Sequence, residues 1–439
     1  MNSFKKKYLS FEFNEVNIEW LDYYVNKYNF KNLRLLFKNN FLKTSSEKKY
    51  EELEPWIQWP SFYYGKSLSQ HKIFHLGDCH HNENLSIYDF FQKENLSVLA
   101  VSPMNCTFDV KNQSLLIHDP WSSFNVMGGD KFIDKLWLSI RYFVNENSNN
   151  SLKISYLFTL LIGIAKFARL KNTLYYFKFI FLSFFFKWSR AILLDLLVFD
   201  IFYFYKDKRN FHYSSVFLNA GAHIQHHYFF DSKYYKENHG KSLNPKSYSS
   251  LATKKLDPIF QIYKLYDHLS KDINDLNKNN NILVTSGLQQ KENLSPYYQY
   301  RLRDYVKFLN TFKIKYKAIE KKMSRDSYIY FNNKDEYLFA ITSLKKFLIN
   351  GNSLFKIKEN KKEHAIFLQV AYRGEINEFS NVFYDDKPLN LLKSISLVSI
   401  ENTIHRSDGW HLNNFFKFNE SSCNIKDLTK SIFGFDFVK

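Results

Sequence analysis

The sequence predicts an α/β protein in which a mostly parallel sheet is covered by helices on both faces. Three stretches, at residues 84–102, 191–219 and 257–285, each place an apolar or amphipathic helix before a short apolar strand. Such alternation is typical of parallel sheets, because each connection between parallel strands crosses a face of the sheet. Polar residues follow several of these strands, at the carboxyl edge where such sheets bind ligands.

The individual elements follow the same pattern along the chain. Residues 9–13 form a short apolar run, and residues 16–37 place apolar side chains at helical spacing. Ser86 is suited to cap the helix of the next unit, since its hydroxyl can accept a hydrogen bond from the first turn. We therefore expect one sheet that contains the strands at 9–13, 97–101, 215–219 and 282–285.

The domain organisation predicted from this pattern is a core with an insertion. Between residues 120 and 190 the alternation fails and apolar helical segments dominate. The sequence therefore predicts a first part of the core at 1–149, a helical insertion or cap at 150–205, and the rest of the core at 206–439. The last part contains a mixed subregion around residues 294–395.

The composition is that of a folded protein with excess positive charge. Its 439 residues include 61 Lys and Arg against 43 Asp and Glu, a formal net charge of +18. The basic residues are spread along the chain, and no RNA- or DNA-binding motif accompanies them, so nucleic acid is not the favoured partner. Three distant Cys residues without a C-x-x-C motif support neither a disulfide framework nor a thiolate zinc site. Together with the lack of a recognisable signal peptide, they predict a cytoplasmic location.

The most apolar stretch spans residues 154–205. Charged residues such as Lys166, Arg169 and Asp195 interrupt every apolar run, whereas a bilayer-spanning helix needs about 20 largely uncharged residues. Buried or amphipathic helices are the favoured interpretation. Peripheral contact of this stretch with a membrane is the alternative.

Two polar clusters are candidates for a functional site. His223, His226 and His227 lie within five positions, where helical spacing lets two of them share a face and bind a cation or a phosphate. Ser61 follows Pro60 at an expected helix start, where backbone N–H groups would stabilise a hydroxyl nucleophile and the phosphate it attacks. A surface His cluster and a helix-capping Ser are the respective structural alternatives.

Five blocks, in this order, resemble the alkaline phosphatase superfamily, in particular its type I phosphodiesterase and nucleotide pyrophosphatase branch: residues 11–15, 59–74, 222–230, 284–290 and 404–410. In that family an Asp ends the first strand, and a Ser or Thr nucleophile opens a helix. Asp-x-x-x-His, Asp-His-Gly and a late Gly-x-His supply the remaining ligands of two divalent metals. The resemblance implies an alkaline-phosphatase-like sheet sandwiched by helices.

The chain departs from the family at several metal-ligand positions. Asn14 stands at the first Asp, Ala222 at the Asp of Asp-x-x-x-His, and Gly287 and Leu288 at the Asp-His pair. Two divalent cations held by mostly neutral groups would be poorly neutralised. The resemblance therefore implies at most one divalent metal, zinc or manganese.

The resemblance also implies roles for individual residues. The metal ligands would be Asn14, Glu15, His226 and His405. Ser61 would be the nucleophile, although the family's hydroxyl position can also align with Gln58, which cannot attack. The substrate-binding residues would be Gln58, His223, Arg406 and Asp408. Arg406 and the imidazoles can pair with a phosphate or sulfate, and an ion pair between Arg406 and Asp408 is the structural alternative.

The leading functional hypothesis is a divergent phosphodiesterase, phosphatase or phospho-group transferase that acts on a phosphorylated small molecule or glycan precursor. The alternatives are a non-catalytic relative that binds an anionic ligand, and a basic protein that binds nucleic acid or a membrane surface. The first hypothesis requires Asn14, His226 and His405 to approach one another in one pocket. It also predicts that turnover depends on metal and is lost in Ser61→Ala.

Overall fold

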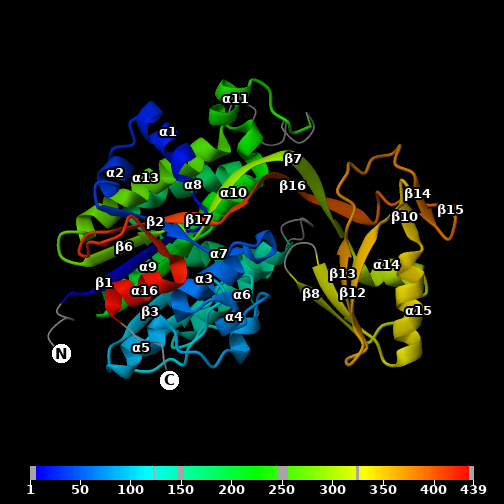
Figure 1. Ribbon diagram of the computed structural model, residues 1–439, viewed down its shortest axis with the longest axis horizontal. Helices are drawn as coiled ribbons and strands as arrows, with labels where there is room; N and C mark the ends of the chain where they lie inside the picture. Colours follow the sequence, from blue (N-terminus) through cyan, green and yellow to red (C-terminus); the bar gives the residue numbers. More distant parts are fainter. Residues whose placement is uncertain (1–5, 123, 147–152, 246–255, 323–325, 435–439) are drawn as a thin grey trace. The chain divides into compact units, whose positions relative to one another are not determined.

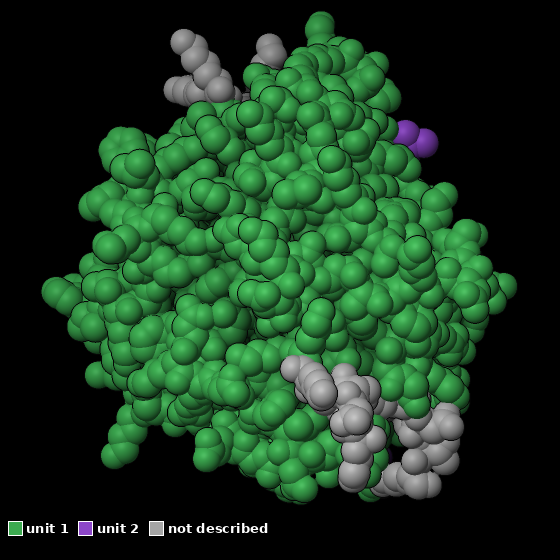
Figure 2. All heavy atoms as spheres, turned by 90° about the vertical axis from the view of Figure 1, so that its left-hand side faces the viewer, with its two compact units in different colours: residues 1–141, 153–293, 402–439 green, residues 142–152, 294–401 purple. Residues whose placement is uncertain are grey.

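The computed structural model describes residues 6–122, 124–146, 153–245, 256–322 and 326–434 (Figure 1). It divides into two compact units, which Figure 2 shows in different colours. Unit 1 contains residues 1–141, 153–293 and 402–439, and unit 2 contains residues 142–152 and 294–401. The chain enters the larger segment of unit 2 along β7 (Gln289–Leu302) and leaves it along β16 (Ile395–Arg406).

Unit 1 is built on an eight-stranded sheet with the strand order β18-β2-β17-β6-β1-β5-β3-β4. Its strands are β1 (Tyr8–Phe13), β2 (Asn40–Ser45), β3 (Val98–Val101), β4 (Leu115–Ile117), β5 (Tyr213–Leu218), β6 (Asn281–Thr285), β17 (Asp408–Asn413) and β18 (Ser422–Asn424). β1 pairs in parallel with β5 and β6, and β3 pairs in parallel with β5 and β4. Only β17, among the described strands of this sheet, runs antiparallel to its neighbours, β2 and β6. The expected α/β class and the single sheet for the four predicted strands are confirmed.

Helices cover both faces of this sheet (Figure 1). The described α-helices of unit 1, of which α6 continues into unit 2 after Arg141, are α1 (Ile18–Tyr28), α2 (Lys31–Leu36), α3 (Pro55–Tyr64), α4 (Leu68–His71), α5 (Ile87–Lys93), α6 (Lys131–Glu146), α7 (Ile154–Phe167), α8 (Thr173–Ser183), α9 (Trp188–Lys208), α10 (Ala220–Tyr228), α11 (Lys233–His239), α13 (Pro258–Leu276) and α16 (Ile425–Phe433). Within the described residues, no helix is both long and apolar enough to cross a bilayer.

Strand β1 packs against helices on both faces of the sheet. Alternate side chains of a strand point to opposite sides of the sheet. Phe11 packs against Phe199 and Phe202 of α9, whereas Glu12 accepts a hydrogen bond from Tyr63 of α3. All six residues of β1 are buried, as expected for a central strand of a parallel sheet.

Local signals account for two helix boundaries. Ser86 caps α5, with a reciprocal bond from its backbone N–H to Asp89, so the expected cap is confirmed. The helix expected over 16–37 is two helices, because Asn29 adopts a left-handed φ of 52° and ends α1. Residues 154–208 are mainly helical, as α7, α8 and α9, and α9 packs on β3 and β5.

Unit 2 has its own hydrophobic core and small antiparallel sheets. Its elements, including the two strands that cross its boundary, are β7 (Gln289–Leu302), α14 (Tyr305–Thr311), β8 (Ala318–Lys322), β9 (Asp326–Tyr330), α15 (Lys334–Lys345), β10 (Phe347–Ile349), β11 (Asn352–Ser353), β12 (Phe355–Asn360), β13 (Ala365–Val370), β14 (Val382–Tyr384), β15 (Lys387–Pro388) and β16 (Ile395–Arg406).

Candidate metal centre

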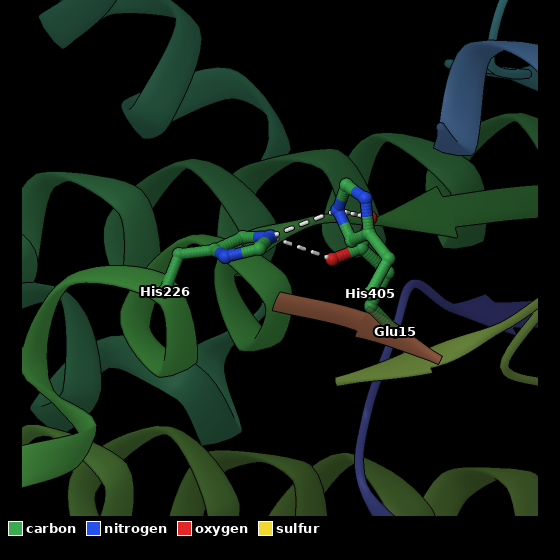
Figure 3. A group of neighbouring side chains, drawn as sticks. All are labelled: Glu15, His226 and His405. Carbon is green, nitrogen blue, oxygen red and sulfur yellow. Dashed lines mark hydrogen bonds and ion pairs between the residues drawn. The ribbon is translucent and has the colours of Figure 1, made fainter. Parts of the chain in front are cut away.

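Three side chains from distant parts of the sequence converge in unit 1: Glu15, His226 and His405 (Figure 3). The Nε2 atom of His226 lies 3.0 Å from Oε2 of Glu15 and 3.1 Å from Nε2 of His405. Nε2 of His405 lies 3.3 Å from Oε1 of Glu15. One carboxylate and two imidazole nitrogens therefore point at one spot.

Glu15 owes its position to the turn that directly follows β1. Its backbone N–H donates to the carbonyl of Ser286, which follows β6, and its φ of 56° lies in the left-handed region. A non-glycine residue in this region stores strain of about 1 kcal/mol or more. The side chain is 1% exposed, and Nε2 of Gln290 donates a hydrogen bond to Oε2. The surroundings thus hold this carboxylate in one orientation.

His226 lies on α10, and its second ring nitrogen is also engaged. Nδ1 lies 3.2 Å from the backbone carbonyl of Thr403 and 3.1 Å from its hydroxyl oxygen. A carbonyl can only accept, so Nδ1 carries the proton in the neutral ring and Nε2 keeps its lone pair. Metal-binding His residues commonly donate their other N–H in this way.

His405 lies near the end of β16 and shows a related arrangement. Its Nδ1 lies 3.7 Å from Oε2 of Glu54, the residue that precedes α3. A carboxylate behind an imidazole favours the tautomer with a proton on Nδ1, so that Nε2 is available as a ligand. The strand that carries His405 continues through Arg406 and pairs with β7 outside the main sheet.

The pKa values of Glu15 and His405 depend on each other's charge. Burial by itself would raise the pKa of Glu15, but the attraction and hydrogen bonds of His405 and His226 outweigh it and hold that pKa far below its usual range. Burial would likewise lower the pKa of His405, whereas Glu15, and Glu54 behind it, raise it. Glu15 therefore remains an anion and favours the protonated form of His405.

The three groups fit a divalent metal ion in number, type and spacing. Ligand atoms about 2.0 to 2.2 Å from a tetrahedral zinc ion lie roughly 3.3 to 3.6 Å from one another, a few tenths of an ångström wider than the separations given above. Two His residues and one carboxylate are a common set for zinc, and imidazole and carboxylate also suit manganese. Three protein ligands leave a coordination position open, which distinguishes catalytic sites from closed structural ones.

Asn14, also expected as a metal ligand, lies next to this group but has other partners. Its amide nitrogen donates to Asn219 over 2.7 Å, and its carbonyl oxygen accepts from the indole of Trp59 over 2.7 Å. Both polar atoms of the side chain thus bond to neutral groups. These contacts favour a role in joining β1 to α10 and α3.

Ser61 lies inside α3, and the expected helix start at this residue was wrong, because α3 begins at Pro55. Proline suits the first helical position since it needs no N–H partner there. The Ser61 hydroxyl is buried, 3.3 Å from the carbonyl of Ile57 and 3.1 Å from Nε2 of His71. Nδ1 of His71 accepts from the N–H of Ile73, so Nε2 of the neutral ring is a donor and cannot take a proton from Ser61.

The residues expected to bind substrate have varied surroundings. Gln58, on α3, donates to the carbonyl of Glu52. His223, on α10, has its ring 4.5 Å from that of His227. Arg406 donates two hydrogen bonds to Asp408, 2.8 and 2.7 Å long, and also pairs with Glu19. The structure thus contains the ion pair that was the structural alternative for Arg406 and Asp408.

Sequence reasoning did not identify the residues that orient the ligands: Glu54, Gln290 and Thr403. Gln290 lies in one of the blocks compared with the family, but nothing in that block marks it as a partner of Glu15. Thr403 and Glu54 carry no local signal either, because their roles depend on contacts across 177 and more than 300 residues of sequence.

Comparison with known proteins gives structural matches over nearly the full chain. No protein-family model matches the sequence, and no curated protein matches it. Phosphonoacetate hydrolase from Sinorhizobium meliloti 1021 is 10% identical, with a TM-score of 0.43, 95% of this chain covered and 93% of that chain. Murine ectonucleotide pyrophosphatase/phosphodiesterase 5 is 11% identical, with a TM-score of 0.41 and coverages of 99% and 96%. The wild-type alkaline phosphatase PafA is 11% identical, with a TM-score of 0.41 and coverages of 97% and 95%.

Proposed function

We propose that this protein binds one divalent metal ion, zinc or manganese, and hydrolyses a phosphate ester or phosphonate of a small molecule or glycan precursor. The observation that carries the proposal is the convergence of Glu15, His226 and His405 at separations of 3.0 to 3.3 Å. The order of the sequence motifs and the hydrolases among the structural matches agree with the substrate class.

The residues around the site each have a task in this proposal. Glu15 supplies the negative charge that neutralises part of a divalent cation, and Gln290 holds its carboxylate in place. Thr403 and Glu54 fix the ring orientations of His226 and His405. A bound divalent ion would polarise a phosphoryl oxygen and lower the pKa of a coordinated water molecule.

A non-catalytic anion-binding protein is the second candidate, and the surroundings of α3 favour it. One alignment places Gln58 at the family's nucleophile position, and an amide cannot attack phosphorus. The hydroxyl of Ser61 is held by His71 and the backbone of Ile57. A protein of this kind would bind a phosphorylated ligand without turning it over.

The experiment that separates the two candidates combines metal analysis with an activity panel. The purified full chain is stripped with a chelator, reloaded with zinc or manganese, and assayed with a phosphodiester, a phosphomonoester and a phosphonate. We expect one metal ion per chain and turnover of at least one substrate only after reloading. Tight binding of inorganic phosphate by the loaded protein, without turnover of any ester or phosphonate, would support the second candidate instead.

Ser61→Ala tests the nucleophile assignment. Because its hydroxyl bonds to the backbone of its own helix and to His71, we expect Ser61→Ala to keep turnover within about threefold, as for the loss of one neutral hydrogen bond. The measurement is the steady-state rate with the best substrate of the panel. A loss of about a hundredfold or more with unchanged metal content would identify Ser61 as the nucleophile.

Glu54→Gln tests the carboxylate behind His405. Loss of such a partner typically weakens metal affinity about 10- to 100-fold, because the ring becomes less basic and less well oriented. Competition with a chromogenic chelator measures the affinity. Glu51→Gln, an exposed carboxylate in the same segment, is the matched control. Equal affinities for the two variants would contradict the proposed role of Glu54.

A further inference from the structure

The most unusual surface of unit 1 is a stripe of exposed large apolar side chains along α8 and its flanks. We call it the α8 stripe, and it consists of Leu170, Leu174, Phe177, Phe181, Phe184 and Phe185. Each of these side chains is at least 62% exposed. Scattered exposed apolar residues are ordinary, whereas a contiguous set of this kind marks an interaction surface.

The spacing of the α8 stripe shows that it is one face of a helix. Leu174, Phe177 and Phe181 recur at intervals of three and four residues, so they lie above one another along α8. Tyr176 and Phe179, on the other side of the helix, are buried at 3% and 0% exposure. The helix is therefore anchored in unit 1 by one apolar side and presents a second apolar side to solvent.

The preceding helix, α7, repeats this arrangement. Ile154, Phe158 and Ile162 are spaced by four residues and are 66%, 62% and 54% exposed. Thr159, Gly163 and Phe167 of the same helix are buried. Two successive helices thus carry an apolar face that packs against nothing in the described part of unit 1.

All charged residues in this stretch of the sequence are basic. Between Lys153 and Leu194 the sequence contains Lys and Arg at seven positions and no Asp or Glu. Three of these basic residues pair with acidic side chains of other elements: Lys166 with Asp130, Arg169 with Asp200 and Asp272, and Lys171 with Asp272. Lys187, which follows α8, is exposed. An apolar face that is followed by exposed positive charge complements a surface that is apolar in depth and anionic at its rim.

We propose that the α8 stripe, with α7 beside it in sequence, docks unit 1 onto the surface of a membrane that contains anionic phospholipids. The Phe and Leu side chains enter the boundary between headgroups and acyl chains, and the exposed Lys187 pairs with a lipid phosphate. The helices lie on the bilayer and do not cross it. This docking is independent of the metal centre and of the proposed hydrolase activity.

The first part of the test measures binding of the purified full chain to vesicles. We expect co-sedimentation with mixed vesicles of phosphatidylcholine and phosphatidylglycerol, weakened by added salt, and little binding to phosphatidylcholine alone. The double variant F177S/F181S should bind the mixed vesicles about tenfold less tightly, since it removes two apolar side chains from the contact. Lys187→Gln should weaken binding about fivefold.

Matched control variants keep the test specific. Leu294 and Phe379 are 83% and 82% exposed but lie in unit 2, so L294S/F379S removes equally exposed apolar groups elsewhere. Lys334→Gln removes an exposed charge from α15. We expect both controls to bind as the wild type does. Thermal unfolding checks that F177S/F181S remains folded.

Three results would overturn the proposal. The first is equal binding to neutral and anionic vesicles, and the second is equal binding by F177S/F181S and its control. The third is self-association of the wild type that F177S/F181S abolishes, together with no binding to either vesicle, because the stripe would then be an interface between two copies of the chain. Sedimentation velocity without lipid measures this last outcome.

Discussion

We expect His226→Ala to bind a metal ion at the proposed centre with an affinity at least about a hundredfold below that of the wild type. Removing a ligand should cost more than the 10- to 100-fold typical of a residue that only supports one. With His226 absent, the three-ligand group is reduced to Glu15 and His405, which cannot complete a site of this type. Metal content after dialysis and the affinity from chelator competition measure the effect.

The neighbouring His residues provide the control for this prediction. His227 lies on the same helix, next to His226, but is not part of the three-ligand group. His227→Ala should keep one metal ion per chain with an affinity within about threefold, as expected for a change outside the ligand set. Metal retained by His226→Ala but lost by His227→Ala would place the site elsewhere on α10.

Glu12→Gln flattens the dependence of stability on pH. Burial raises the pKa of Glu12 to about 8, against the hydrogen bonds from Tyr63 and Ser10 that lower it. A carboxyl group whose pKa is higher in the folded protein adds most to the free energy of unfolding at pH values below its pKa in the unfolded chain, near 4.5. That contribution is lost as the pH rises toward about 8.

The expected size of this effect is large. A shift of the Glu12 pKa from 4.5 to about 8 corresponds to a decrease in the free energy of unfolding on the order of 5 kcal/mol between pH 4.5 and pH 8. The wild type should therefore become less resistant to urea over this range, and Glu12→Gln, which cannot ionise, should lose much less. Asp22→Asn, at an exposed position of α1, is the control and should follow the wild type. If the free energy of unfolding fell equally with pH in Glu12→Gln and in the wild type, this result would contradict the raised pKa of Glu12.

Local sequence was sufficient to predict four of the eight strands of the main sheet, the neighbouring β6, β1, β5 and β3. Strands β1, β3, β5 and β6 lie where apolar runs predicted them, and α9 and α13 overlap the predicted helices. Their patterns are visible within a few residues, because side-chain alternation and helical spacing reflect which face each element buries. The small strands of unit 2 were less predictable, since many of them expose one face and are only two or three residues long.

The motif resemblance predicted four metal ligands, Asn14, Glu15, His226 and His405, and the structure brings the side chains of the last three together. What it did not identify was their immediate setting. Gln290, Thr403 and Glu54 reach the centre through contacts across the fold, and no local pattern marks such partners. At Ser61 a local pattern was present but misleading. The Pro-Ser pair indicated a helix start, whereas the helix begins at Pro55 and the Ser61 hydroxyl is buried within it.

Sequence alone therefore determined the α/β class and the four neighbouring strands β6, β1, β5 and β3 of the main sheet, because these depend on short-range periodicity. Tertiary structure decided that Glu15 meets His226 and His405, 211 residues and more away in sequence. It also decided that Asn14 and Ser61 are engaged by Trp59, Asn219 and His71. A hydrogen bond requires atoms within about 3 Å, and only the folded chain brings such distant residues that close.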